Sequence, residues 1–387
     1  MTGLGHGFAA FAVSALLKPI AADLDAGRGA VSIAIGLGRA VSGVASPLIG
    51  RAADGLGATR VATSGMALTA LGLAALGFVD SLPGLYLAWS LVISAGVAAG
   101  FTVALDKLVV TAVDSSGRGM ALAVRFSIAA VVSAMLLPVV VWLIEAVGWR
   151  ATCFIWAGLF VLLLPVPMLT FPRRDGAGTG VPFRPVSDEA AELLDRPGLR
   201  AAMARREYWI IAMAFMAQAS VTTGLMVHMV PLMTDTGMEA TLAGAIFGAM
   251  ILLSIPFRLL GGFLCDRVGK RMLPMLLAGL IAGEGVFIGF YALQPGLASM
   301  TVLVLALGVA AGTPTLVILV LCAHLFGEHR FATVQGSLMM LQVPGTMAAP
   351  VVAGYAFDLT GSYVGAVAGF AALLVLAGAG LTRLRVR

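Results

Sequence analysis

The residues of this sequence that could do chemistry are few, and several lie inside long apolar runs. Arg39 and Glu284 each stand near the middle of such a run, Arg258 lies in another run, and Asp106 and Arg125 stand in two consecutive runs. A charged side chain in the middle of an apolar membrane helix costs about 2.5–3.5 kcal/mol, so it persists mainly in a cavity or beside a partner. These five residues are therefore candidates for ligand binding, proton movement or ion pairing.

The two arginines of the first group lie on stripes of small residues. Arg258 shares its stripe with Ser254, Gly261 and Cys265 at helical spacing. A guanidinium fork suits a carboxylate, because it can donate two parallel hydrogen bonds. Arg258 should either bind an anionic ligand or act as a structural arginine that pairs with a backbone carbonyl or an acid. Arg39 lies opposite an apolar face, so it should face protein or a cavity, where it contacts the ligand or latches a facing helix.

Asp106 and Arg125 lie equally far from the turn at residues 115–116. In an antiparallel helix pair this places them at one depth, so we expect a neutralising ion pair. A proton-coupling role for Asp106 is the alternative, which the arginine would oppose by favouring the charged carboxylate. Glu284 should be either a protonated packing residue or a proton site.

Three further polar residues, His6, His228 and Gln218, are candidates to line a ligand site. Each histidine could instead be a satisfied helix-packing residue. Paired carboxylates, an H-E-x-x-H motif, a serine–base constellation and a nucleotide-binding loop are all missing from the sequence, and the three cysteines lack metal-ligand spacing. The sequence therefore predicts no enzyme, no cofactor, no metal site and no nucleotide-driven pump.

The composition of the chain indicates the environment in which these residues lie. The chain is 60% hydrophobic and 11% charged, with a mean hydropathy of +1.02. A water-soluble domain could not cover so much apolar surface, and runs of ~20 apolar residues match the thickness of a bilayer core. We predict an all-α integral membrane protein. Its twelve expected spans are 2–22, 30–49, 61–80, 84–106, 120–144, 149–171, 208–233, 241–264, 272–292, 298–322, 332–357 and 364–381.

The net charge of +5 reflects topology rather than nucleic-acid binding. Lys and Arg gather in the loops after even-numbered spans, in the central loop and in the C-terminal tail, whereas the opposite side holds only Lys18, Arg28 and Arg150. Because cytoplasmic loops carry the excess of Lys and Arg, both termini should be cytoplasmic. We expect a multi-pass protein of the inner cell membrane.

The two halves of the chain match at an offset of 212 positions, the distance from Asp54 to Asp266. At this offset prolines, aspartates, an arginine and the run Gly96–Gly100 all meet their counterparts. Each half has six spans, so the repeat is parallel. We predict two six-helix bundles, 1–171 and 208–387, joined by a cytoplasmic loop at 172–207. The seventh span begins at a position that corresponds to one before Met1, so we expect the true start to lie upstream.

The most recognisable repeated feature is a charged, glycine-punctuated loop with the skeleton G-x-x-x-D-x-x-G followed by a basic residue. It occurs at Gly50–Arg60 and again at Gly262–Arg271. Together with the parallel repeat and the basic central loop, this motif resembles the major facilitator superfamily over the whole chain. The resemblance implies secondary transport by rocking of the two halves. It also implies a cytoplasmic gate formed by Gly50, Arg51, Asp54, Gly57, Arg60, Gly262, Asp266, Arg267, Gly269 and Lys270, with Arg118 and Arg330 as partners.

Finer features are similar to the monocarboxylate-porter and oxalate/formate-antiporter-like group. They include Lys18–Ile20, Gly148–Arg150, His228–Pro231 and Asp358–Tyr363. In this group an arginine of the eighth helix binds the substrate carboxylate, which implies that role for Arg258. The sequence departs from oxalate-type members, because the stretch 341–345 has no lysine.

The drug-antiporter signature of the fifth helix is also missing, and only Pro138 remains of it. The expected function is proton- or exchange-coupled transport of small organic anions, with monocarboxylates as the first choice. The protein should work as a monomer in the bilayer, without nucleic acid or nucleotide. Two alternatives stay open: efflux of an apolar or cationic compound, and a non-transporting receptor of the same fold.

Overall fold

Helices dominate the structure, a computed structural model that describes residues 12–105, 108, 118–170, 200, 202–326 and 331–384. No strand occurs within these ranges. This follows from the apolar composition, because a segment that crosses lipid must satisfy its backbone polar groups internally, as a helix does. The chain divides into two compact units. Unit 1 comprises Met1–Glu189 and Glu239–Gly248, and unit 2 comprises Ala190–Met238 and Ala249–Arg387.

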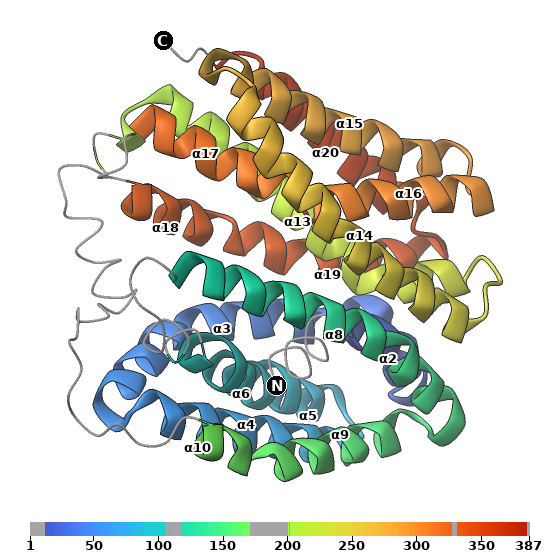
Figure 1. The fold of residues 1–387 in the computed structure, drawn as a ribbon. Coiled ribbons are helices and arrows are strands. Elements are labelled where there is room, and N and C mark those ends of the chain that lie inside the picture. The colour runs from blue at the N-terminus through green and yellow to red at the C-terminus, as the bar shows by residue number, and fades with distance from the viewer. Residues whose placement is uncertain are drawn as a thin grey trace. The chain divides into compact units, whose positions relative to one another are not determined.

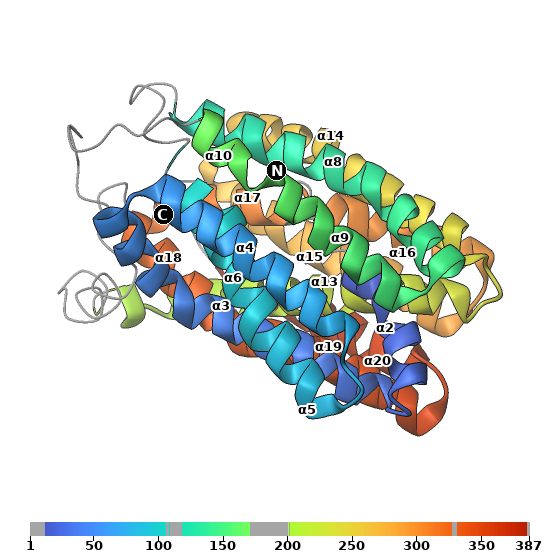
Figure 2. The ribbon, with the colours of Figure 1, turned by 90° about the horizontal axis from the view of Figure 1, so that it is seen from below.

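Unit 1 contains the first six predicted spans. Within it α4 packs along α9 (Figure 2). The fourth span alternates between α-helical and π-helical segments, which are wider turns often found near functional positions. The elements are α2 (Val13–Asp23), α3 (Arg28–Leu56), α4 (Ala58–Gly77), α5 (Leu82–Leu85), η2 (Tyr86–Ile93), α6 (Ser94–Val97), η3 (Ala98–Val103), α8 (Arg118–Val147), α9 (Trp149–Leu163) and α10 (Pro165–Thr170).

Unit 2 contains the other six spans, apart from the first turns of α14. Its most extensively packed helix pair is α15 and α20, which run alongside one another (Figure 1). The elements are α13 (Arg206–Thr234), α14 (Ala240–Arg267), η4 (Lys270–Met272), α15 (Leu273–Leu293), α16 (Leu297–Ala310), α17 (Pro314–Phe326), α18 (Phe331–Leu341), α19 (Val343–Thr360) and α20 (Val364–Leu381).

The predicted spans are confirmed as helices. Eleven helical segments among the described residues are long and apolar enough to cross a membrane, and the predicted span at 2–22 is described only from Ala12 onward. Prolines divide three spans that the sequence predicts as continuous. The breaks precede Pro165, Pro314 and Pro344, where the missing N–H and the proline ring interrupt the helical ladder.

One local expectation is wrong. The motif at Gly50–Arg60 is predicted as a loop, but α3 continues through it to Leu56 and α14 likewise continues to Arg267. Residues 50–56 contain no proline, so nothing ends the helix there. The chain turns only at Gly57, whose φ of +90° suits glycine because it has no Cβ.

Large apolar side chains cover the outside of both units. Val44 is 75% exposed, Leu293 is 82% exposed and Leu359 is 84% exposed. Such a surface would be an aggregation hazard in water but is what lipid tails require. The outer faces of the helices therefore agree with membrane insertion.

The duplicated glycine run, Gly96–Gly100 and Gly308–Gly312, allows close helix packing in both units. In unit 1, Gly96 and Gly100 lie against the backbone of α4, with no room for a Cβ. In unit 2, Gly312 lies against the backbone of α14 in the same way, and Gly308 lies against the same helix less tightly, with the Leu253 side chain as its nearest neighbour. Small residues let helix backbones approach closely, so the run positions the fourth helix of each repeat.

Candidate functional site

The tenth span is broken at its centre, and this break organises the polar residues of unit 2. Helix α16 ends at Ala310, α17 begins at Pro314, and residues 311–313 between them leave the helix. Proline has no N–H, so the carbonyl group of Ala310 loses its helical donor. At the corresponding position of the first repeat stands Thr102, inside the π-helical segment η3. The break is therefore particular to the second repeat.

Two predicted site residues satisfy carbonyl groups at this break. Gln218 of α13 donates from Nε2 to the Ala310 oxygen at 3.3 Å. Arg258 of α14 donates from Nη2 to the Ala311 oxygen, also at 3.3 Å. A buried carbonyl without a donor costs about 1–3 kcal/mol, so both bonds stabilise the break. Side chains from two different helices therefore meet consecutive residues of a third span.

The small-residue stripe of α14 faces the same break. Thr313 donates from Oγ1 to the Phe257 carbonyl at 2.8 Å, and its methyl group lies against Gly261. Ser254 is buried and donates back to the Ile251 carbonyl of its own helix. The predicted stripe is thus the surface on which the broken span packs.

Gly312 sets the distance between the break and α14. A Cβ on this residue would lie 2.5 Å from the Ser254 carbonyl oxygen and 2.9 Å from the Arg258 backbone nitrogen. Both are backbone atoms, which cannot rotate away. Only glycine fits here without a shift, and its close approach holds the Ala311 carbonyl within reach of the Arg258 side chain.

Arg258 keeps most of its hydrogen-bonding capacity. The side chain is half-buried, and within the described part of unit 2 it makes no ion pair. A guanidinium carries five N–H donors, and the Ala311 carbonyl accepts only one of them. Of the two roles expected for Arg258, the carbonyl contact is present, and the remaining donors can still bind an anion bidentately.

Glu284 lies on the core-facing stripe of α15, in line with Ile281, Ile288 and Tyr291. It is only 4% exposed, and neither carboxyl oxygen makes a hydrogen bond with the described residues. The polar side chain beside it is Gln218. Gln218 therefore stands between Glu284 and the helix break.

His228 of α13 is completely buried, and both of its ring nitrogens are engaged. Nε2 lies 2.8 Å from the Pro350 carbonyl oxygen, and Nδ1 lies 3.0 Å from the Tyr363 hydroxyl group. A carbonyl only accepts, so Nε2 carries the proton and Nδ1 accepts from the tyrosine. The geometry favours the helix-packing role that the sequence left open for this histidine, rather than substrate contact.

The polar candidates of unit 1 are described more sparsely. Arg39 of α3 is exposed and makes no ion pair within the described part of this unit. It lies about 160° around the helix from Leu37, which is on the apolar face. Arg125 of α8 donates from Nη2 to the Phe101 carbonyl at 2.8 Å. Its expected partner Asp106 lies outside the described residues, so the ion pair stays a prediction.

The gate motif is described in part. Gly50 lies within α3, and Arg60 is exposed in the first turn of α4. The Arg267 guanidinium lies over the Phe263 ring at 4.2 Å, a contact that favours the charge at an exposed helix end. Gly262 has open space around it, as does Gly269. His6, Arg330 and the side chains of Arg51, Asp54, Arg118, Asp266 and Lys270 lie outside the described residues.

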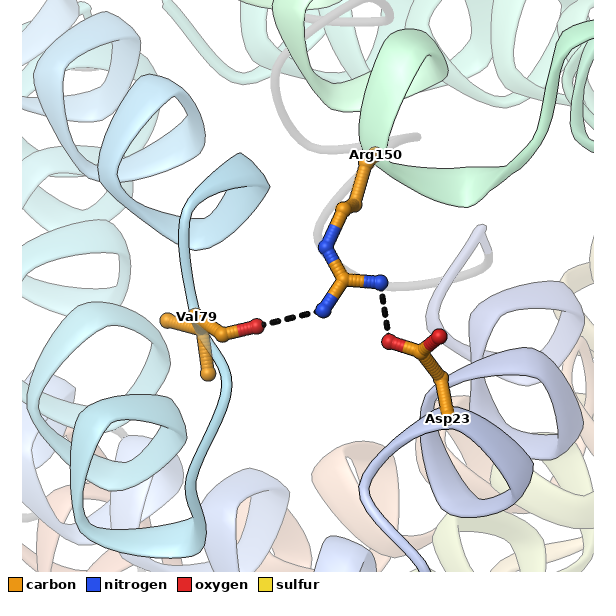
Figure 3. Close-up of polar contacts among 3 residues, drawn as sticks. All are labelled: Asp23, Val79 and Arg150. Carbon is orange, nitrogen blue, oxygen red and sulfur yellow. Dashed lines mark hydrogen bonds and ion pairs between the residues drawn. The ribbon is translucent and has the colours of Figure 1, made fainter.

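A polar cluster that the sequence analysis missed joins three helix ends of unit 1 (Figure 3). Arg150, at the start of α9, pairs with Asp23 at the end of α2. Its Nη2 also donates to the Val79 carbonyl just beyond α4, at 2.8 Å. Asp23 is repeated in the second half as Asp235. The position that matches Arg150 in the second half is occupied by Ser362. The arginine of this cluster is therefore not repeated in the second half of the sequence.

The fold and the motif agree with a comparison to known families. The family model described as Major Facilitator Superfamily matches residues 1–350, with a second match over residues 232–386. The chain belongs to the major facilitator superfamily. The resemblance stated from its motifs is confirmed, and this major facilitator chain is a multi-pass membrane transporter of a small-molecule substrate rather than an enzyme.

Curated relatives narrow the group within the superfamily. The chain is 25% identical over 356 residues to Monocarboxylate transporter 13 of Rattus norvegicus, covering 91% of this chain and 78% of that protein. It is 28% identical over 334 residues to Monocarboxylate transporter 11 of Mus musculus, covering 84% and 72%. The predicted similarity to the monocarboxylate-porter group is confirmed by these relatives.

Solved structures support the twelve-helix major facilitator fold. The nucleoside transporter NupG aligns with a TM-score of 0.74 at 15% identity, covering 98% of both chains. A bacterial homologue of the human lysosomal transporter Spinster, in an inward-facing and occupied conformation, aligns with a TM-score of 0.71 at 16% identity, covering 98% and 94%. At such low identity these alignments establish the fold alone.

Proposed function

We propose that this protein is a secondary transporter of small organic anions, monocarboxylates first among them. The observation that carries the proposal is the environment of Arg258. This arginine is half-buried, donates to a carbonyl group at the break of the tenth span, and has no acid partner among the described residues of its unit. A cation so placed favours an anionic ligand, because a charge in a membrane helix persists where something compensates it.

The chemistry of Arg258 suits a carboxylate in particular. A carboxylate presents two oxygens to the planar guanidinium, which matches them with two parallel N–H donors. The names of the curated relatives support the same ligand class. We propose Arg39 as a second cation for the substrate path and Gln218 as a polar neighbour of the anion site. His6 stays a proposed liner, whereas for His228 the buried geometry favours packing.

We further propose that transport proceeds by alternating access, with the halves 1–171 and 208–387 moving as bodies on either side of the linker 172–207. The paired motifs at Asp54 and Asp266 would act as the cytoplasmic gate.

The excess of Lys and Arg in alternate loops supports an inner-membrane protein with both termini in the cytoplasm. The working unit is proposed to be the monomer. Coupling is to protons or to exchange of a second anion, with the Asp106–Arg125 pair as a scaffold.

The experiment is uptake into proteoliposomes of a panel of radiolabelled carboxylates. Competition by unlabelled organic anions, apolar compounds and organic cations is measured in parallel. We expect a monocarboxylate to be taken up and to be displaced only by anions. The Arg258→Ala variant should lose this uptake, whereas the matched Arg383→Ala variant, which alters an exposed arginine just after α20, should keep it.

The same panel separates the alternatives. Displacement by apolar or cationic compounds alone would favour an efflux transporter of another class. Uptake by Arg258→Ala at the parental rate would show that the anion is bound elsewhere and would refute the proposed site.

A further inference from the structure

We propose that Glu284 is the proton-binding group of this transporter, and that Gln218 and the break at residues 311–313 couple it to the anion site at Arg258. The coupling rests on the proposed function, since it needs an anion at Arg258. The proton site rests only on the surroundings of Glu284. All of these residues belong to unit 2.

The first argument is the burial of an acid without a counter-charge. Glu284 is 4% exposed at mid-length of α15, and neither of its oxygens makes a hydrogen bond with the described residues. An ionised carboxylate needs strong donors or a cation when it is removed from water. A carboxylic acid needs much less, so the neutral, protonated form fits this position.

The second argument is that the described side chains of the elements packed against α15 bring no charge to Glu284. These elements are α16, α17, α20 and η4, together with α13, which carries Gln218. Helices α16 and α20 contain no ionisable residue. The ionisable residues of the other elements are Cys322 and His324 of α17, Lys270 and Arg271 of η4, and Arg206, Glu207, Tyr208 and His228 of α13.

Among those whose side chains the structure describes, none makes an ion pair or a hydrogen bond with Glu284, and the polar side chain beside Glu284 is that of Gln218. His228 is committed to Pro350 and Tyr363. His324 and Arg271 are exposed. The proton on Glu284 is therefore controlled by its neutral surroundings rather than by a neighbouring charge.

The third argument comes from the donors of Gln218. Its Nε2 donates to the Thr222 hydroxyl at 3.0 Å and to the Ala310 carbonyl at 3.3 Å. An amide nitrogen carries two hydrogens, so these bonds use both. What Gln218 can still offer is Oε1, which only accepts. The O–H group of protonated Glu284 can donate to Oε1, a bond that forms only when the two side chains approach, since neither Glu284 oxygen is hydrogen-bonded to a described residue in this structure.

The break of the tenth span links the proton site at Glu284 to the anion site at Arg258. Gln218 holds the Ala310 carbonyl and Arg258 holds the Ala311 carbonyl, one residue further on. An anion that draws the guanidinium away from Ala311 changes the hydrogen bonding of the break. The same change disturbs Gln218, the polar side chain that lies beside Glu284. Two ligands that bias one structural element are coupled reciprocally, so each alters the affinity for the other.

The proton step is a simple transfer. With the site closed, the O–H of Glu284 donates to Oε1 of Gln218. When water reaches the site, the O–H bond breaks, the proton passes to a water molecule and leaves as hydronium, and a carboxylate remains. Reloading from the other side reverses these changes. One proton thus accompanies one monocarboxylate, and the pair crosses the membrane without net charge.

The direct test is infrared spectroscopy of the purified protein during a pH titration, because a protonated carboxyl group has its own C=O stretching band. We compare the parent with Glu284→Gln and with the matched control Glu239→Gln, which alters an exposed acid. The parent and the control should show a carboxyl band that persists after exposed acids have ionised. Glu284→Gln should lack it. An undiminished band in Glu284→Gln would overturn the proposal.

A second variant guards against misfolding of Glu284→Gln. Replacing Gln218 by leucine removes the acceptor, so the same band should move to higher wavenumber. A band at the parental position in Gln218→Leu would overturn the link between these residues. This measurement needs no substrate, so it decides the proton site even if no carboxylate proves to be transported.

Transport assays test the coupling. In proteoliposomes, Glu284→Gln should lose carboxylate uptake driven by a pH gradient but keep exchange of labelled for unlabelled carboxylate, since exchange needs no net proton movement. Retained gradient-driven uptake would overturn the coupling. Loss of exchange as well would also overturn it, because Glu284 would then serve binding or folding. Failure of the parent to transport any anion would refute the proposed function alone.

Discussion

Replacing Gly312 by alanine tests the architecture of the candidate site most sharply. The added Cβ would lie 2.5 Å from the Ser254 carbonyl oxygen, about 0.8 Å closer than the ~3.3 Å of an ordinary carbon–oxygen contact. It would also lie 2.9 Å from the Arg258 nitrogen and 3.3 Å from the Phe257 carbonyl carbon. All three are backbone atoms, so relief requires the tenth span to move away from α14.

Overpacking of this kind costs about 1–3 kcal/mol, so Gly312→Ala should lower the thermal denaturation midpoint in detergent. It should also weaken anion binding, because the Ala311 carbonyl moves relative to the Arg258 guanidinium. The matched control is Gly279→Ala, where a Cβ meets nothing within 4 Å. The control should be as stable as the parent or slightly more stable, since alanine favours the helix over glycine. If Gly312→Ala matched the parent in both stability and binding, the close approach would not matter and this reasoning would fail.

Two further predictions concern polar contacts away from the anion site. His228→Leu removes the hydrogen bonds to Tyr363 and Pro350 and should destabilise the protein by about 1–3 kcal/mol. The affinity of the folded variant for the anion should stay at the parental value. A loss of affinity without a loss of stability would make His228 a substrate ligand instead. Arg150→Met should cost about 1–2 kcal/mol, because it removes a partly exposed ion pair with Asp23 and one bond to a carbonyl. A double-mutant cycle with Asp23→Asn checks the second prediction, and a coupling energy of zero would contradict the pair.

Much of the scaffold could be predicted because its signals are local or repeated. Twenty-residue apolar runs identify spans directly, and the offset of 212 relates Asp54 to Asp266 without any structure. The helical course of Gly50–Leu56 was missed because charged residues near glycines are typical of loops. That stretch contains no proline, which indicates that the helix can continue through it. The chain changes direction only at Gly57.

The candidate site was harder to predict, because its residues come from four spans. Helical periodicity identified the stripe of Arg258, but it could not show that this stripe faces a break. Gly312 and Pro314 lie in the middle of a predicted span and are visible in the sequence. Pro314 also departs from the repeat, because the matching residue of the first half is Thr102. The contact of Gln218 with the break depends on the packing of α13 against distant segments, which sequence spacing does not encode.

The central claim is that Arg258 holds a carboxylate, and equilibrium binding of a labelled monocarboxylate to purified protein tests it directly. Hydrogen bonds to charged groups are worth about 1.5–3 kcal/mol, so Arg258→Gln should weaken binding by about 10- to 140-fold. Arg383→Gln removes an exposed positive charge from the same unit and should bind like the parent. Parental affinity in Arg258→Gln, or an equal loss in both variants, would contradict the account.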